Sequence, residues 1–225
     1  HGNLQPGATH EKGMWHDVLP DPFTYDGPDD KFFVQRVSGK KINNQDSGVF
    51  PQAELDWHNN MNGPGTKARG VALQAVSGVK GTGTAFLDTT KAYAALSDEI
   101  KARCKGIIAK FKYNPSVWGE GLPEWQLKFM VTSTSTEHYE MPLVNVNTYN
   151  GCKGLYFHFL NECTIPSDPG LLDILKEHCF KEEFVYTHMW EPGDIVISEQ
   201  LLTLHKRVLN HPSLNQERVL HRYTF

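Results

Sequence analysis

The sequence predicts a mainly β protein with flanking helices, a double-stranded β-helix (jelly roll) formed by residues 1–225 as a single domain. Three observations support this fold class: many short strand-like runs divided by turn signals, few amphipathic helices, and no regular alternation of strands with helices. The chain has 225 residues, 39% of them hydrophobic, with 19 Gly and 13 Pro. This composition is typical of a loop-rich globular protein and excludes a coiled coil or a disordered chain.

The strand predictions rest on short runs of β-branched and aromatic residues between turn signals. These runs are 31–38, 70–78, 83–88, 183–190, 193–199 and 217–225. A Gly-rich turn separates 70–78 from 83–88, and Pro192-Gly193 forms the turn before 193–199. Residues 141–159 are expected to form a hairpin, because Asn150-Gly151 is a strong signal for a two-residue turn.

Two segments show helical periodicity. Residues 88–106 carry apolar side chains at spacings of three and four, with Asp88 or Thr89 as the N-terminal cap and Gly106 at the end. Residues 168–180 form a second amphipathic segment. Both helices are expected to pack against the outside of the β-structure, because each has only one apolar face to bury.

Charge and cysteine content exclude several classes of protein. The net charge of −4 argues against a nucleic-acid partner, since phosphate binding requires a basic surface. The four cysteines include no Cys-x-x-Cys pair, so free thiols in a reducing compartment are expected. With no apolar run of membrane-spanning length and no visible signal peptide, we expect no membrane partner and a cytoplasmic location. The chain starts at His1 and not at Met, which fits a truncated N-terminus.

Histidines and arginines are the first candidates for chemistry. His58 follows Trp57, and taken alone such a residue is usually a packed, hydrogen-bonded histidine. His205 is expected just past a strand, where loops carry functional residues. In 217–225 the alternation of a strand places Arg218 and Arg222 on one face, and buried arginines are costly unless they meet anions.

Together these residues fit one type of site. A non-haem Fe(II) oxygenase holds its iron on one face with two histidines and one carboxylate, which leaves positions open for a co-substrate and oxygen. An arginine can then bind the far carboxylate of the co-substrate as a two-pronged donor. The sequence supplies the two histidines and the arginines, and a surface strand remains the alternative for 217–225.

The chain resembles the taurine dioxygenase-like (clavaminate synthase-like) family of Fe(II)/2-oxoglutarate-dependent oxygenases. The resemblance rests on the ordered set WHNN, GTGTAFLDTTKAYAALSDEI, GLYFHFLNECTI, EEFVYTHMWEPGDIVISEQLLTLH and RVLHR. It implies Fe(II) and 2-oxoglutarate as cofactors and molecular oxygen as a reactant. The residue roles that it implies are iron ligation by His58 and His205, 2-oxoglutarate binding by Thr84 and Arg218, substrate or co-substrate contact by Arg222, and a turn at Asp194.

Position 60 departs from the family pattern, because Asn60 stands where the family has Asp or Glu. Asn60 can act as a weaker, neutral third ligand to the iron, or its place can be vacated for an anion, as in the family's radical halogenases. A third interpretation is a catalytically inactive jelly-roll binding protein, and a fourth is an Asn introduced to trap a substrate. Asp56 is a candidate replacement carboxylate, and Glu199 is a weaker one.

The substrate is expected to be a small zwitterionic or anionic molecule. Arg222 offers a fixed positive charge to its anionic group, and Glu54 is the candidate for a cationic group. The segment 112–125, which contains Trp118 and Trp125, stands where the family has a mobile lid over the active site. The sequence leaves open whether the chain forms a homo-oligomer.

Overall fold

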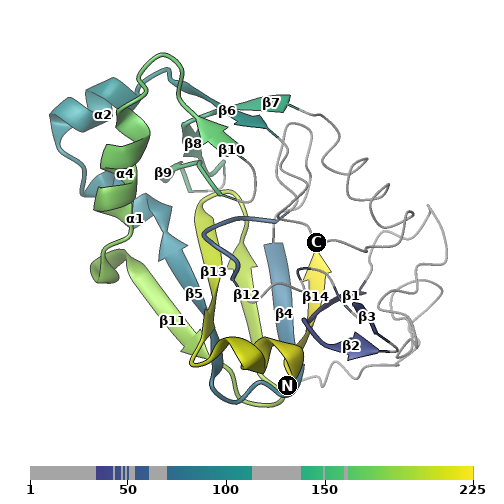
Figure 1. Cartoon of the computed structure of the whole chain (residues 1–225). Coiled ribbons are helices and arrows are strands. Elements are labelled where there is room, and N and C mark those ends of the chain that lie inside the picture. The colour runs from purple at the N-terminus through teal and green to yellow at the C-terminus, as the bar shows by residue number, and fades with distance from the viewer. Residues whose placement is uncertain are drawn as a thin grey trace.

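The strands of this computed structural model form antiparallel sheets, with helices on one side (Figure 1). The structure describes residues 34–42, 44–46, 48, 50, 54–60, 70–112, 138–148, 150–159 and 162–224. The predicted class, mainly β with a jelly-roll arrangement and flanking helices, is confirmed. None of the described helices has the length and apolar character needed to cross a membrane.

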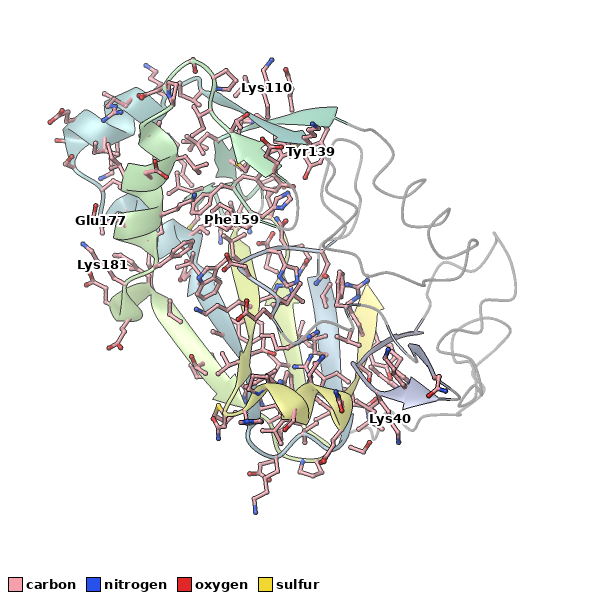
Figure 2. The ribbon with its side chains drawn as sticks, viewed as in Figure 1. Lys40, Lys110, Tyr139, Phe159, Glu177 and Lys181 are labelled. Atoms are coloured by element: carbon pink, nitrogen blue, oxygen red, sulfur yellow. The ribbon has the colours of Figure 1, made fainter. Side chains whose placement is uncertain are left out.

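Two larger sheets position the functional residues. The first has the strand order β1-β14-β4-β12, and the second has the order β11-β5-β13. Their bounds are Val34–Val37 for β1, Gly70–Ser77 for β4, Thr82–Asp88 for β5, Val185–Met189 for β11, Ile195–Glu199 for β12, Thr203–Leu209 for β13 and Val219–Thr224 for β14. Side chains fill the space between these sheets (Figure 2). One pocket takes lining residues from β4 and β14 of the first sheet and from β5 and β13 of the second, so the two sheets face each other across it.

Smaller strands complete the β-structure. One three-stranded sheet has the order β10-β6-β7, and two further pairs are β2-β3 and β8-β9. Their bounds are Lys41–Ile42 for β2, Gln45–Asp46 for β3, Ile108–Lys112 for β6, His138–Pro142 for β7, Val144–Val146 for β8, Lys153–Leu155 for β9 and Glu162–Thr164 for β10.

The helices gather beside the second sheet (Figure 1). They are α1 (Thr89–Ala94), α2 (Asp98–Cys104) and α4 (Leu171–Cys179), with short 3-10 turns at η2 (Glu182–Phe184) and η3 (Pro212–Gln216). Although α1 and α4 are far apart in sequence, they contact each other. Helix α4 buries its leucines in the main hydrophobic cluster, while Glu177 and Lys181 point outwards (Figure 2). The helical segments therefore cover one face of the β-structure, as expected.

The predicted single helix over 88–106 is wrong, because the chain forms two helices there. Asp88 caps α1, its Oδ1 accepting from the backbone N–H groups of Thr90 and Lys91. The hydroxyl of Ser97 then accepts from the backbone N–H of Ile100 and starts a second helix. A serine in extended backbone conformation that satisfies a helical N–H group interrupts one helix and begins another.

The predicted hairpin in 141–159 is present as β8 and β9, but the prediction of a two-residue turn between its strands is wrong. Val146 pairs with Lys153, which leaves the segment 147–152 as the connection. The backbone N–H of Asn147 donates to the carbonyl oxygen of Cys152, and Gly151 has a positive φ of 72°. Asn150 does not have the positive φ that a type I′ turn requires of both central residues, so the loop is longer.

Candidate functional site

His58 and His205 meet between the sheets. The backbone N–H of His58 donates to the carbonyl oxygen of His205 at 2.9 Å, and the reverse bond is 2.8 Å long. Their imidazole ring centroids lie 4.2 Å apart, and both residues are buried. The prediction that His205 follows a strand in a loop is wrong, because it lies within β13. Two histidines that are 147 residues apart in sequence (205 − 58) therefore share one position in the fold.

The surroundings of His58 suit a metal ligand. Its Nδ1 lies 2.7 Å from the carbonyl oxygen of Asp56. A carbonyl can only accept, so Nδ1 carries the proton and Nε2 keeps its lone pair, the arrangement typical of metal-binding histidines. Burial, and secondarily the charge of Arg222, lowers the pKa of His58 to about 4, while burial holds the pKa of His205 well below its ordinary value. Both rings are thus neutral at pH 7, the form that binds metals.

Asn60 lies beside His205, and Arg222 fixes the orientation of its amide. One Nη of Arg222 donates to Oδ1 of Asn60 at 2.5 Å, and Nδ2 of Asn60 lies 3.0 Å from Nε2 of His205. A guanidinium only donates, so the oxygen of the amide must face Arg222 and the NH₂ group must face the imidazole. In this arrangement the amide presents no oxygen to the position between the two histidines.

Gln200 holds the segment that carries these residues, a role the sequence did not reveal. Its side-chain Oε1 accepts from the backbone N–H of Asn60 at 2.7 Å, and its carbonyl oxygen accepts from Nδ2 of Asn59 at 3.0 Å. All three residues are buried. A long-range anchor of this kind depends on tertiary contact and leaves no local sequence signal.

The candidate replacement carboxylates are engaged with backbone. Oδ1 of Asp56, an exposed residue, accepts from the N–H of Trp57 at 2.7 Å, and Oε2 of Glu199 accepts from the N–H of Leu202 at 2.6 Å. Asp194 accepts from the N–H of Glu191, as expected of a turn residue. Over the described part of the chain, no cluster of three or more His, Cys, Asp or Glu residues is suited to hold a metal. The two imidazoles fit an iron site, but the described residues supply no carboxylate as the third protein ligand.

Arg218, Thr84 and Arg222 line the same pocket as the two histidines. The indole N–H of Trp190 donates to Oγ1 of Thr84 at 3.1 Å, which leaves the hydroxyl hydrogen of Thr84 for another acceptor. Trp190 therefore orients a polar group of the pocket. Apolar side chains, including Leu73 from β4, form other parts of its wall.

The buried arginines give the pocket its charge. Arg218 and Arg222 are almost fully buried, and Nε of each has no hydrogen-bond partner among the described residues. Burial lowers the pKa of each to about 10, so both remain charged at pH 7. A buried guanidinium is costly unless an anion compensates it, and a carboxylate fits its fork of donors. The pocket therefore fits a carboxylate-bearing co-substrate such as 2-oxoglutarate.

Three further features concern the surroundings of the pocket: Glu54, the expected lid and Phe50. Glu54 is exposed and does not line the pocket, so the structure does not bring it to the other candidates. Residues 113–125 of the expected lid lie outside the described residues. Phe50, which the sequence did not single out, lines the pocket with its ring centroid 6.0 Å from that of His58. Its φ of 55° is unusual for a bulky residue, and a conformation of this kind is not readable from sequence.

Comparison with known families gives one extended match. The family described as "Taurine catabolism dioxygenase TauD, TfdA family" matches residues 20–224. This match covers both histidines, Asn60 and the arginines of the pocket. The resemblance proposed from the sequence motifs is confirmed.

Curated relatives share between a quarter and a third of their residues with the chain. Pentalenolactone F synthase from Streptomyces arenae is 29% identical over 194 residues, which is 78% of this chain and 62% of that protein. The alpha-ketoglutarate-dependent 2,4-dichlorophenoxyacetate dioxygenase of Cupriavidus pinatubonensis is 28% identical over 155 residues, 67% of this chain and 53% of the relative. The chain thus spans about three fifths or less of the length of these relatives.

Solved structures agree on the fold. A crystal structure of AAD-2 in complex with Mn(II) and N-oxalylglycine has a TM-score of 0.61 and 25% identity, covering 78% of this chain and 69% of that one. A taurine dioxygenase from Burkholderia xenovorans has a TM-score of 0.64 and 21% identity, covering 92% of this chain and 65% of that one. The second likeness, at this identity, concerns the fold alone.

Proposed function

Because the chain belongs to the taurine catabolism dioxygenase TauD/TfdA family, we propose that it is an Fe(II)- and 2-oxoglutarate-dependent oxygenase that hydroxylates a small anionic or zwitterionic molecule. The observation that carries the proposal is the meeting of His58 and His205 in a pocket that also holds the buried Arg218. Iron, when bound, would supply the redox chemistry that couples oxidative decarboxylation of 2-oxoglutarate to hydroxylation of a C–H bond.

Each functional residue of the pocket has a separate role in this proposal. His58 and His205 are the neutral imidazoles that would hold the metal, and Nε2 of His205 becomes available to it when Nδ2 of Asn60 no longer donates to that nitrogen. Arg218 binds the distal carboxylate of 2-oxoglutarate, and the hydroxyl of Thr84, oriented by Trp190, donates to it. Arg222 is the candidate partner for an anionic group of the substrate, and it must leave Asn60 or share its donors with that group.

Asn60 affects how the metal is held. Its oxygen is turned to Arg222, so the third position of the metal is open to a water molecule or an added anion unless the amide turns over. Turning the amide over would place its NH₂ group against a guanidinium, two donors facing each other. We therefore expect Fe(II) to bind through the two imidazoles and more weakly than in relatives with a carboxylate at this position.

The test of the proposal is spectroscopic and chemical. Anaerobic addition of Fe(II) and 2-oxoglutarate should produce the weak visible charge-transfer band of the chelate, and oxygen should then release succinate in the presence of candidate substrates. Arg218→Met should raise the concentration of 2-oxoglutarate needed for the band by roughly 10- to 100-fold, the effect expected for losing a charged hydrogen bond. Absence of the band at saturating concentrations of both additions would contradict the proposal.

A binding protein without catalysis is the second candidate, and one observation favours it. Asn60 bonds to both Arg222 and His205, so the side-chain atoms that face one another at this point are paired without a metal. In that case 2-oxoglutarate should raise the melting temperature of the metal-free protein, and Fe(II) should produce neither the band nor succinate. Such a result would replace the oxygenase with a dicarboxylate-binding module.

A further inference from the structure

The pocket between the sheets is smaller than the ligand proposed for it. Its volume is about 30 Å³, close to the share of one molecule in liquid water. 2-Oxoglutarate carries two carboxylates on a carbon chain and is several times larger than a water molecule. Binding of such a ligand therefore requires that a side chain of the pocket wall moves aside.

The sheets hold most of this wall in place, because most of the lining residues belong to β1, β4, β5, β13 and β14. Leu55 and His58 lie outside the named strands but are bonded to the backbone of β13, at Arg207 and His205. Phe50 also lies outside the strands, and a side chain reaches it from β13. One Nη of Arg207 donates to the carbonyl oxygen of Phe50 at 3.0 Å. Breaking this bond leaves the pairing of the sheet intact.

The backbone of Phe50 is in an unfavourable conformation. Its φ of 55° lies in the left-handed region, where Cβ approaches the following carbonyl oxygen. A bulky residue stays in this region only when its surroundings compensate for the strain. Here the ring is buried in an apolar cluster with Trp190 and Leu220. Packing of the ring, and not the preference of the backbone, therefore holds Phe50 in the pocket.

The ring of Phe50 also contacts the charged part of the pocket. Its centroid lies 5.7 Å from Cζ of Arg222 and 6.0 Å from the centroid of the His58 imidazole. An aromatic face attracts a guanidinium at this distance. A carboxylate attracts a guanidinium more strongly, because it forms charge-assisted hydrogen bonds. An anionic ligand therefore competes with the ring of Phe50 for Arg222.

We propose that Phe50 is a plug of this pocket: its ring fills part of the space that a ligand needs and moves aside when the ligand binds. The plug selects ligands by size, since the closed pocket admits only a group about as large as water. Exposing a phenylalanine ring lowers the population of the open form by roughly 10- to 100-fold, and the apparent affinity falls by the same factor. The inference rests on the proposed function for the identity of the ligand, 2-oxoglutarate, and not for the plug itself.

Chemical labelling without metal or ligand tests the plug itself. Diethyl pyrocarbonate acylates neutral imidazole nitrogens and is larger than the pocket, so it reaches Nε2 of His58 only in the open form. Phe50→Ala should accelerate the modification of His58, followed by mass spectrometry, roughly 10- to 100-fold. Val79→Ala is the matched control, because Val79 belongs to the same apolar cluster but does not line the pocket. This variant should be labelled at the rate of the unmodified protein.

Binding kinetics test the plug as a barrier to 2-oxoglutarate. Tryptophan fluorescence after rapid mixing, with Mn(II) present, measures the association rate constant, since Trp190 bonds to Thr84 in the pocket. Phe50→Ala should raise this constant roughly 10- to 100-fold, and Val79→Ala should leave it unchanged. Phe50→Leu keeps an apolar side chain in the cluster and should show a smaller rise in both measurements.

The outcomes separate the plug from the proposed function. The plug is wrong if His58 reacts no faster in Phe50→Ala than in the unmodified protein, even if the unmodified protein gives the iron band and succinate. Should the alanine variant fail to fold, the same comparison with Phe50→Leu decides. If labelling accelerates but none of these proteins binds 2-oxoglutarate, the oxygenase proposal fails and the plug stands. Faster labelling with unchanged association of 2-oxoglutarate would overturn the assignment of Phe50 as a barrier to this ligand.

Discussion

At the scale of single residues, the orientation of one amide decides what the site can do. An aspartate at position 60 could give one oxygen to Arg222 and the other to a metal. Asn60 has only one oxygen, and Arg222 takes it. The replacement of an oxygen by an NH₂ group therefore removes a charge and also turns a donor towards His205.

The variant Asn60→Asp tests this orientation. We expect it to increase the affinity for Mn(II) by at least 10-fold, because it restores a charged oxygen donor, and even indirect contacts to a metal typically change affinity by about 10–100-fold. Titration calorimetry or electron paramagnetic resonance of free Mn(II) measures the change. Asn60→Ala, which removes the amide without adding a carboxylate, should show no such gain. Equal affinities for Asn60→Asp and the unmodified protein would place residue 60 outside the metal's reach.

Part of this pocket could be predicted from the sequence because its residues lie in short recognisable motifs. His58, Thr84, His205, Arg218 and Arg222 were chosen in this way, and all of them line one pocket. Other pocket or supporting residues were not predicted, because their positions depend on tertiary structure. Arg207 gains its place from its pairing with β5, and Gln200 from bonds to a segment 140 residues away. Glu54 was chosen from its charge and its closeness to Trp57, and neither property reports the direction of a side chain.

At the scale of elements, local capping decides where helices begin. The apolar stripe through 88–106 is continuous, which is why periodicity alone predicted one helix. Asp88 and Ser97 each satisfy backbone N–H groups at the start of a helix, and the second cap divides the stripe. Strand β13 was missed because it follows β12 after only a short turn, so the two looked like one strand and a loop. Strong periodicity thus identified the elements, and capping and turn geometry set their bounds.

Substitution of Ser97 tests the division into α1 and α2. Ser97→Ala should lower the free energy of unfolding by about 0.5–2 kcal/mol, since it removes the acceptor for the N–H of Ile100. Chemical denaturation monitored by circular dichroism measures this change. Ser97→Asp, which keeps a capping oxygen, should retain most of the stability. If Ser97→Ala is as stable as Ser97→Asp, the serine does not act as a cap.

At the scale of the whole molecule, the core encloses neutral polar groups as well as apolar side chains. His158 is fully buried beside Phe111, whose ring stacks on it with centroids 4.6 Å apart, and its Nε2 lies 2.5 Å from the hydroxyl of Tyr139. His221 is also buried. Burial lowers the pKa of His158 to about 3 and that of His221 to about 4. Between these values and a pH of about 6.5, the two histidines therefore stay neutral in the folded chain and bind protons in the unfolded chain.

The stability of the protein should consequently fall in mild acid. An unfolded histidine has a pKa of about 6.5, so above that pH both states are neutral and His158 adds no pH dependence. As the pH falls from about 6.5 towards 3, the unfolded chain takes up a proton that folded His158 refuses. Each such histidine then lowers the free energy of unfolding by up to about 1.4 kcal/mol per pH unit.

Urea unfolding at a series of pH values between 7.5 and 5 would measure this slope, and His158→Gln isolates the contribution of one buried ring. Glutamine keeps a polar group opposite the hydroxyl of Tyr139 but has no proton to gain in this range. The free energy of unfolding of the variant should therefore fall less steeply below pH 6.5. The slope should be smaller than that of the unmodified protein by up to about 1.4 kcal/mol per pH unit, the contribution of one proton. Parallel curves for the variant and the unmodified protein would mean that His158 takes up its proton in the folded state, so the ring would not be enclosed as the core packing requires.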